Sequence, residues 1–147
     1  MAGTILDKTA IPFDGTDAAE LAVDQMAPLL TAVGGTVHIV MVLDHYVENQ
    51  LADFASTERL TMEQAARTSC ERLAAAVSEK GIAASWEIVE GDDVVDAVVA
   101  VTKASGCTAI VLPTHGFSTV TRWLMGNLRD KIVQSAGMPV IVVPPKN

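Results

Sequence analysis

A small group of cationic side chains gives the first chemical signal in this sequence. Arg122, Arg129 and Lys131 are three of the ten lysine and arginine residues in a chain of formal net charge −8. Such a local reversal of charge suits a phosphate group, which lysine and arginine bind through charge-assisted hydrogen bonds. The spacing also fits a solvated helix face with ion pairs three or four residues apart, so both interpretations stay open.

Two turn segments follow apolar stretches and are candidates for positioning a ligand. Asp14-Gly15-Thr16 comes after the apolar residues 9–13, and the segment from Pro113 to Asn127 comes after the apolar residues 108–112. Asp-Gly is a turn dipeptide in any protein, so Asp14 can be a turn residue with no further role.

The common catalytic and metal-binding motifs are absent. The chain has no GxxxxGK[ST] phosphate loop and no GxGxxG, HExxH, GxSxG or CxxC pattern. His38, His45 and His115 are not at metal-ligand spacing, so no metal site is predicted. His38 lies in an apolar segment and is expected to be a hydrogen-bonded structural residue. Cys70 and Cys107 are too few for a zinc or disulfide framework and are expected to be buried thiols.

Composition favours one globular domain spanning residues 1–147. The hydrophobic fraction is 50% and the aromatic fraction only 4%, so the core must consist of Val, Ile, Leu and Ala. This aliphatic bias suits strands that are buried on both faces, as in parallel sheets.

Charge and hydropathy exclude several classes of partner. The net charge of −8 disfavours nucleic acid and anionic membrane surfaces. The chain has no run of about 18 apolar residues and no basic N-terminal region before an apolar stretch, so neither a membrane span nor a signal peptide is predicted. A cytoplasmic location is expected.

Five short apolar segments predict strands, because they are rich in β-branched residues. They are residues 9–13, 36–43, 84–90, 108–112 and 140–143. Residues 36–43 are nearly continuous in apolar character and should form a central strand, whereas residues 84–90 alternate and should lie nearer an edge.

The first helix is expected after Thr16 or Asp17, either of which can cap it, and it should end at Gly34-Gly35. Pro28 lies inside it and should bend or shorten it, because proline removes a backbone donor. Its buried face is predicted to comprise Ala22, Met26, Leu29, Leu30 and Val33.

Three more helices and a mobile loop at 44–55 complete the pattern. The second helix should begin near Ser56 or Thr57, the third should span 94–105 after a turn at 91–93, and Asn127 should cap the fourth. Gly81 and Gly106 should end the second and third. The inner faces are predicted to comprise Met62, Ala66, Cys70, Leu73 and Val77 of the second helix, and Leu128, Ile132 and Ala136 of the fourth.

Strict alternation of strands and helices predicts an α/β fold of the Rossmann-like kind, an open parallel sheet of five strands with helices on both faces. Ligands of such sheets bind beyond the carboxyl ends of the strands, where the strand order reverses. Those ends carry Asp14-Gly15-Thr16 and the segment from Pro113 to Asn127.

Four segments, in order and at the right spacing, resemble the universal stress proteins over nearly the whole chain. Residues 11–16 (IPFDGT) look like that family's first strand and turn, and residues 89–92 (VEGD) like its third. Residues 109–116 (AIVLPTHG) look like its fourth strand and loop, and residues 138–143 (MPVIVV) like its last strand.

The resemblance implies an adenine-nucleotide cleft with a partly altered motif. Members that hold ATP carry Gly-x2-Gly-x9-Gly-[Ser/Thr] after the fourth strand, and this chain reads Pro113-x2-Gly116-x9-Gly126-Asn127. Glycines let backbone amides approach phosphate oxygens, and the last pair opens a helix whose N-terminus favours an anion. Pro113 has no N–H to offer, whereas Asn127 can still donate from its side chain.

By the same resemblance, ATP, with or without magnesium, would be the ligand. Asp14 would lie near the adenosine, and Val42 would offer its backbone to adenine. The implied nucleotide-binding residues are Pro12, Phe13, Asp14, Val42, Leu112, Pro113, Gly116, Gly126, Asn127 and Leu128.

Three functions remain open at this stage. The first is a stress-response regulatory protein that binds an adenine nucleotide, and the second is a nucleotide-free interaction module of the same family, which Pro113 and Asn127 favour. The third is a hydrolase that uses His115 with Ser118 or Thr119, although no oriented nucleophile turn is evident. Slow hydrolysis of bound ATP would need no dedicated base, so no catalytic residue is assigned.

The last strand gives a prediction about assembly. Val140, Ile141, Val142 and Val143 form a short apolar strand near the chain end. An exposed edge of this kind can pair with another chain, and the family similarly pairs its last strands. A homodimer through this strand is therefore expected.

Overall fold

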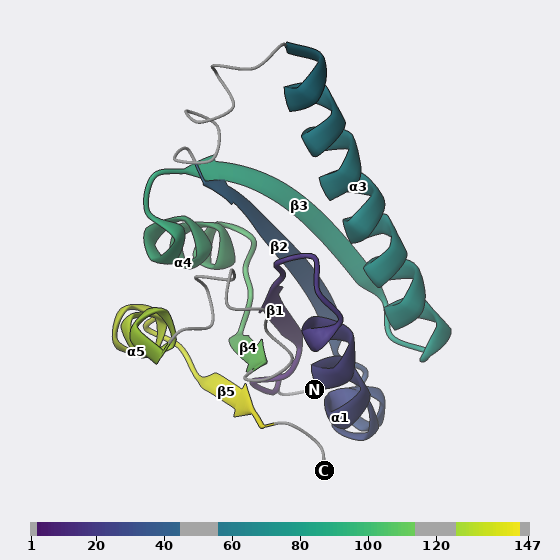
Figure 1. Cartoon of the computed structure of the whole chain (residues 1–147). Helices are drawn as coiled ribbons and strands as arrows, with labels where there is room; N and C mark the ends of the chain where they lie inside the picture. The colour runs from purple at the N-terminus through teal and green to yellow at the C-terminus, as the bar shows by residue number, and fades with distance from the viewer. Residues whose placement is uncertain (1–2, 45–55, 114–125, 145–147) are drawn as a thin grey trace.

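The computed structural model describes residues 3–44, 56–113 and 126–144, with only the backbone described for 44, 56–61 and 126–128. Figure 1 shows the arrangement of the helices and strands. In chain order they are β1 (Lys8–Pro12), α1 (Ala18–Val33), β2 (Thr36–Asp44), α3 (Ser56–Glu79), β3 (Ala84–Gly91), α4 (Val94–Ala104), β4 (Ala109–Pro113), α5 (Gly126–Ser135) and β5 (Val140–Val143).

The five strands form one parallel sheet in the order β3-β2-β1-β4-β5. This confirms the predicted fold class, the five strand segments, the interior position of β2 and the edge position of β3. The chain moves outward from β1 to β3 and then returns to β4 on the other side of β1. The strand order therefore reverses between β1 and β4.

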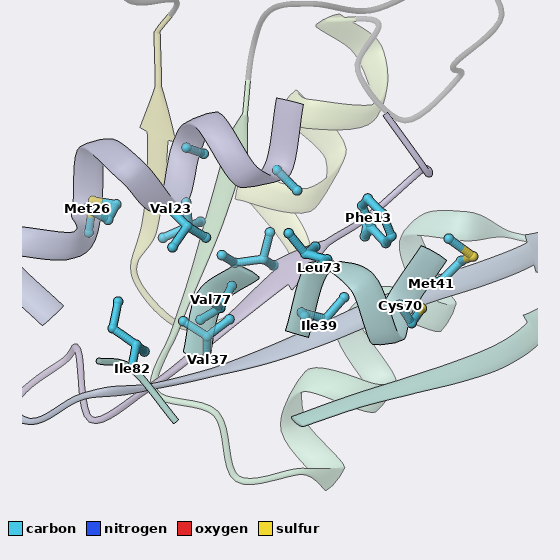
Figure 2. Close-up of a cluster of buried hydrophobic side chains, with 14 of the residues drawn as sticks. Phe13, Val23, Met26, Val37, Ile39, Met41, Cys70, Leu73, Val77 and Ile82 are labelled. Atoms are coloured by element: carbon cyan, nitrogen blue, oxygen red, sulfur yellow. The ribbon is translucent and has the colours of Figure 1, made fainter. Parts of the chain in front are cut away.

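Helices cover both faces of the sheet, and neighbouring residues of one strand point into different cores. Ile11 belongs to the cluster on one face that contains Val23 of α1 and Leu73 of α3. Figure 2 shows the latter two side chains. The next residue toward the N-terminus, Ala10, packs with Val95 of α4 on the opposite face. This alternation explains why the inner strands read as continuous apolar runs rather than as alternating ones.

The predicted helix ends are largely confirmed. Gly34, Gly81 and Gly106 all adopt the left-handed conformation that follows a helix, which glycine reaches without a steric penalty. Asp93 caps α4, because its side chain accepts a hydrogen bond from the Asp96 backbone N–H.

The caps of two helices differ from the prediction. Asp17 occupies the residue before α1 but makes no side-chain cap hydrogen bond. Asn127 is not a cap, since α5 already begins at Gly126. Residue 127 therefore lies in the first turn of the helix.

Pro28 does not shorten α1, because the helix continues to Val33, and the alternative expectation of a bend stays a prediction. Pro28 is exposed, so water can serve the carbonyl that its missing N–H would have met.

Three residues of the predicted helix faces are also exposed rather than buried. They are Leu29 (56%), Val33 (42%) and Met62 (36%). In α1 the buried stripe follows Ala22, Met26 and Leu30 at four-residue steps, and Leu29 and Val33 lie beside this stripe.

Candidate functional site

The two strands at the reversal of strand order separate before they end. β1 pairs with β4 only at Thr9 with Ala109 and Ala10 with Ile110. On their other sides both strands remain paired to their last residues, β1 with β2 as far as Pro12 and β4 with β5 as far as Pro113. The sheet therefore opens between the carboxyl ends of β1 and β4, where ligands of open parallel sheets bind.

Asp14 lies in the turn directly beyond this opening. Its Oδ1 accepts hydrogen bonds from the Thr16 backbone N–H at 2.9 Å and from the Thr16 hydroxyl at 2.6 Å. Its Oδ2 is buried and has no hydrogen-bond partner within the described part of the chain. A carboxylate oxygen in this state is a ready acceptor for a hydroxyl or amine of a ligand.

The other residues predicted for the site contribute in different ways. Pro12 and Pro113 end the two separating strands and are buried. The side chains of Phe13, Val42 and Leu112 are buried and belong to three different hydrophobic clusters.

The remaining predicted residues have no described side chains. Gly126, Asn127 and Leu128 form the first turn of α5, and only their backbone is described. Outside the described residues lie the predictions for His45 and most of the 44–55 loop, and for Gly116, His115, Ser118, Thr119 and Arg122. Of the cationic group, Arg129 is half-buried and Lys131 exposed.

A separate pocket of about 190 Å³ lies between the start of α1 and the middle of α3. Its walls include Thr16 and Asp17 of the turn before α1 and Ser69 and Arg72 of α3. Sequence reasoning did not identify this pocket, because its two walls are far apart in the sequence. Of the residues predicted for the site, it shares only Phe13.

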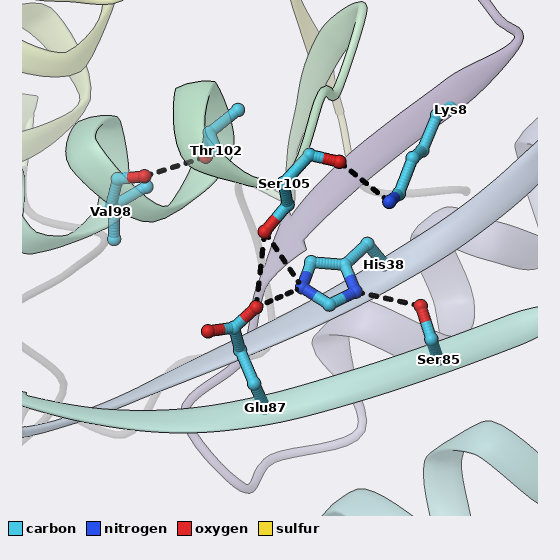
Figure 3. Close-up of polar contacts among 7 residues, drawn as sticks. All are labelled: Lys8, His38, Ser85, Glu87, Val98, Thr102 and Ser105. Carbon is cyan, nitrogen blue, oxygen red and sulfur yellow. Dashed lines mark hydrogen bonds and ion pairs between the residues drawn. The ribbon is translucent and has the colours of Figure 1, made fainter.

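A second polar cluster surrounds His38 on the other side of the sheet (Figure 3). His38 Nε2 lies 2.6 Å from Glu87 Oε2, and its Nδ1 lies 2.7 Å from Ser85 Oγ. The hydroxyl of Ser105, at the end of α4, donates to the same Glu87 oxygen at 3.1 Å, and Lys8 Nζ donates to the Ser105 carbonyl at 2.6 Å. The cluster thus joins β1, β2, β3 and the end of α4.

These contacts confirm that His38 is a hydrogen-bonded structural residue. Each ring nitrogen has a close polar partner, Glu87 on one side and Ser85 on the other. The partners were missed because they come from other elements. The parallel register that places Ser85 beside His38 could have revealed one of them.

Both cysteines are buried, as predicted. Burial raises the pKa of Cys70 from its ordinary value of 9.0 to about 11, and the negative charge of Glu71 adds to the effect. Burial also raises the pKa of Cys107, partly opposed by Lys8. Neither thiol therefore has the reactive thiolate character of a nucleophile.

In the described part of the chain, no three His, Cys, Asp or Glu side chains gather as metal ligands. None of the described helices combines the length and the apolar character needed to cross a bilayer.

The family model described as the universal stress protein family matches residues 6–144. The chain belongs to the universal stress protein family. The resemblance drawn from four sequence segments is thereby confirmed. No curated protein matches the chain in sequence.

Solved structures share the universal stress protein fold at low sequence identity. A hypothetical protein whose biochemical function was assigned from its structure has a TM-score of 0.80 and 22% identity, covering 98% of this chain and 99% of its own. A universal stress protein from Burkholderia pseudomallei has a TM-score of 0.71 and 21% identity, covering 98% and 100%. The universal stress protein of Archaeoglobus fulgidus, solved in complex with dAMP, has a TM-score of 0.67 and 17% identity, covering 95% and 98%.

Proposed function

We propose that this chain is a cytoplasmic stress-response regulator that binds an adenine nucleotide, ATP included, where β1 and β4 separate. The observation that carries the proposal is the buried Oδ2 of Asp14, which has no partner among the described residues. An unpaired buried acceptor is costly, and a ligand donor would remove that cost. A ribose hydroxyl or an adenine amine is a donor of the right kind.

The relatives support the class of ligand. The structurally similar protein of Archaeoglobus fulgidus was solved with dAMP, an adenine nucleotide. In this chain, α5 begins at Gly126, the third glycine position of the motif. We further propose that residues 1–147 form a single domain of this family.

A second candidate function is a nucleotide-free interaction module. Pro113 favours it, because the residue that ends β4 has no N–H to donate to a phosphate.

Two measurements separate these candidates. The first is mass spectrometry of small molecules released by denaturing freshly purified protein, and the second is equilibrium titration with labelled ATP and magnesium. Near-stoichiometric ATP, ADP or AMP, or saturable binding below about 1 mM, supports the nucleotide regulator. An empty protein that shows no saturation at millimolar ATP refutes it and leaves the interaction module.

We propose that the protein is a homodimer through β5. This strand forms an edge of the sheet, and Val142 is 41% exposed there. Sedimentation at tens of micromolar protein should give the mass of a dimer, and a monomer mass would refute the proposal.

Two lysine variants test whether β5 is the interface. Val142→Lys should weaken the dimer without unfolding the chain, because the side chain is already exposed. Ile141 packs partly against the core, so Ile141→Lys tests the interface less cleanly.

A further inference from the structure

Two prolines end the two strands that separate, and the hydrogen-bond pattern shows which way each one faces. Along a strand, successive backbone amides point to opposite neighbours. The Ile110 N–H donates to the Pro139 carbonyl, on the β5 side, at 3.0 Å, so the nitrogens of residues 111 and 113 face β1. The Phe13 N–H donates to the Val40 carbonyl of β2 at 2.8 Å, so the nitrogen of Pro12 faces β4. Both proline nitrogens therefore face the opening.

This orientation explains why the pairing of β1 with β4 stops at Ala10 and Ile110. The next two bonds of the ladder would run from the nitrogen of residue 12 to the Val111 carbonyl, and from the nitrogen of residue 113 to the Pro12 carbonyl. Neither can form, because proline has no N–H.

The opening is consequently rich in acceptors. The carbonyl oxygens of Val111 and Pro12 receive no donor from the ladder, although both residues are buried. Asp14 follows β1 directly, and its Oδ2 is a buried side-chain oxygen without a partner among the described residues. A phosphate offers only acceptor oxygens and carries negative charge, so these three oxygens disfavour it. A hydroxyl or an amine would satisfy them.

We propose that this opening selects the nucleoside part of the ligand through its hydrogen-bond donors, so that adenosine supplies most of the affinity and the phosphate chain adds little. The proposal rests on the proposed function, because it names the part of the nucleotide that this same site recognises. The donor is either the exocyclic amine of adenine or a ribose hydroxyl.

A competition series against labelled ATP tests the selection. Adenosine should bind within about tenfold of ATP, and inorganic tripolyphosphate should fail to compete at a hundredfold excess. Two analogues show which donor the site recognises. Purine riboside lacks the exocyclic amine, and 2′,3′-dideoxyadenosine lacks the 2′ and 3′ hydroxyls. At least one of them should bind about tenfold more weakly than adenosine, as the loss of a hydrogen bond to these acceptors requires.

The failures of the two proposals are distinguishable. If ATP binds but tripolyphosphate competes as well as adenosine, or both analogues match adenosine, the selection is overturned and nucleotide binding stands. If neither ATP nor adenosine binds, the proposed function fails and the selection fails with it.

Restoring an amide at the end of β4 provides an independent test. In Pro113→Ala the new N–H can donate to the Pro12 carbonyl and extend the ladder. Adenosine affinity should then fall about tenfold, while the amide of residue 113 becomes protected from hydrogen exchange. Pro139→Ala, at the opposite end of the sheet, is the matched control and should leave the affinity unchanged. An unchanged affinity in Pro113→Ala overturns the proposal.

Discussion

The His38 cluster and the opening between β1 and β4 are both polar regions in a mostly aliphatic sheet. They differ in whether their polar groups have hydrogen-bond partners. Around His38, both ring nitrogens have partners, and Glu87 and Ser105 bond to each other as well. At the opening, Asp14 Oδ2 lacks a partner within the described residues, and two prolines prevent the strands from supplying donors.

This difference distinguishes polar groups that stabilise the fold from polar groups that are able to bind a ligand. A buried cluster that satisfies itself gains nothing from a ligand, and it stabilises the fold. Unpaired buried acceptors cost stability unless something else pairs with them. The comparison therefore supports the proposal that a ligand binds at the carboxyl ends of β1 and β4, and it indicates that Ser85, His38 and Glu87 have a structural role.

The comparison is tested most strongly by removing the histidine. His38→Ala should lower the free energy of unfolding by about 3 kcal/mol, because it creates a cavity and removes the contacts of the imidazole with Ser85 and Glu87. Chemical denaturation measures the loss. Gln64→Ala, at an exposed position on α3, is the control and should change stability little. Nucleotide affinity of the folded His38→Ala protein should be unchanged, and a large loss of affinity would contradict the structural role.

The pH dependence of stability tests whether the Cys70 thiol of α3 is buried in the core. Folding raises the pKa of Cys70 from 9.0 to about 11, so the folded chain keeps a proton that the unfolded chain releases between these values. The free energy of unfolding should therefore be unaffected by Cys70 below about pH 9 and should fall as the pH rises toward 11. The full loss from this thiol is about 2 to 3 kcal/mol. Denaturation of Cys70→Ala at pH 8 and 11 should show a smaller difference than the parent protein.

Asp14→Asn tests the other region. An amide nitrogen at the position of Oδ2 would be a donor facing a ligand donor, so affinity for an adenine nucleotide should fall roughly tenfold or more. The contact of Oδ1 with Thr16 can persist, so the stability should change little. Asp17→Asn is the matched control, because the Asp17 side chain makes no cap hydrogen bond. Equal affinities of the two variants would refute a binding role for Asp14.

Substitution of Thr9 tests the same comparison and should have the smallest effect on stability. Its hydroxyl is buried without a partner among the described residues, as Asp14 Oδ2 is, but Thr9 lies early in β1, away from the opening. Thr9→Val should therefore raise the free energy of unfolding by about 1 kcal/mol without altering nucleotide affinity. Thermal denaturation measures the gain. A lower melting temperature would show that the hydroxyl is satisfied in the protein.

Much of the fold could be predicted from the sequence because its signals are local. Apolar β-branched runs separated by Gly81, Gly106 and similar stops specify strands and helix ends without reference to distant residues. The fully buried strands imply helices on both faces. Leu29 and Met62 were predicted to be buried but are exposed. They show the limit of this reasoning, because helical periodicity does not define how wide or how long the buried face is.

The site was only partly predictable. The sequence alone determined that Asp14 and Pro113 come directly after apolar segments, that Pro113 has no backbone N–H to donate, and that the chain resembles the universal stress proteins. Only the tertiary structure decided that β1 lies beside β4, and that the nitrogens of Pro12 and Pro113 face each other's strand. Residues about 100 positions apart acquire a shared hydrogen-bond pattern only through the register of the sheet, and that register follows from packing of the whole chain.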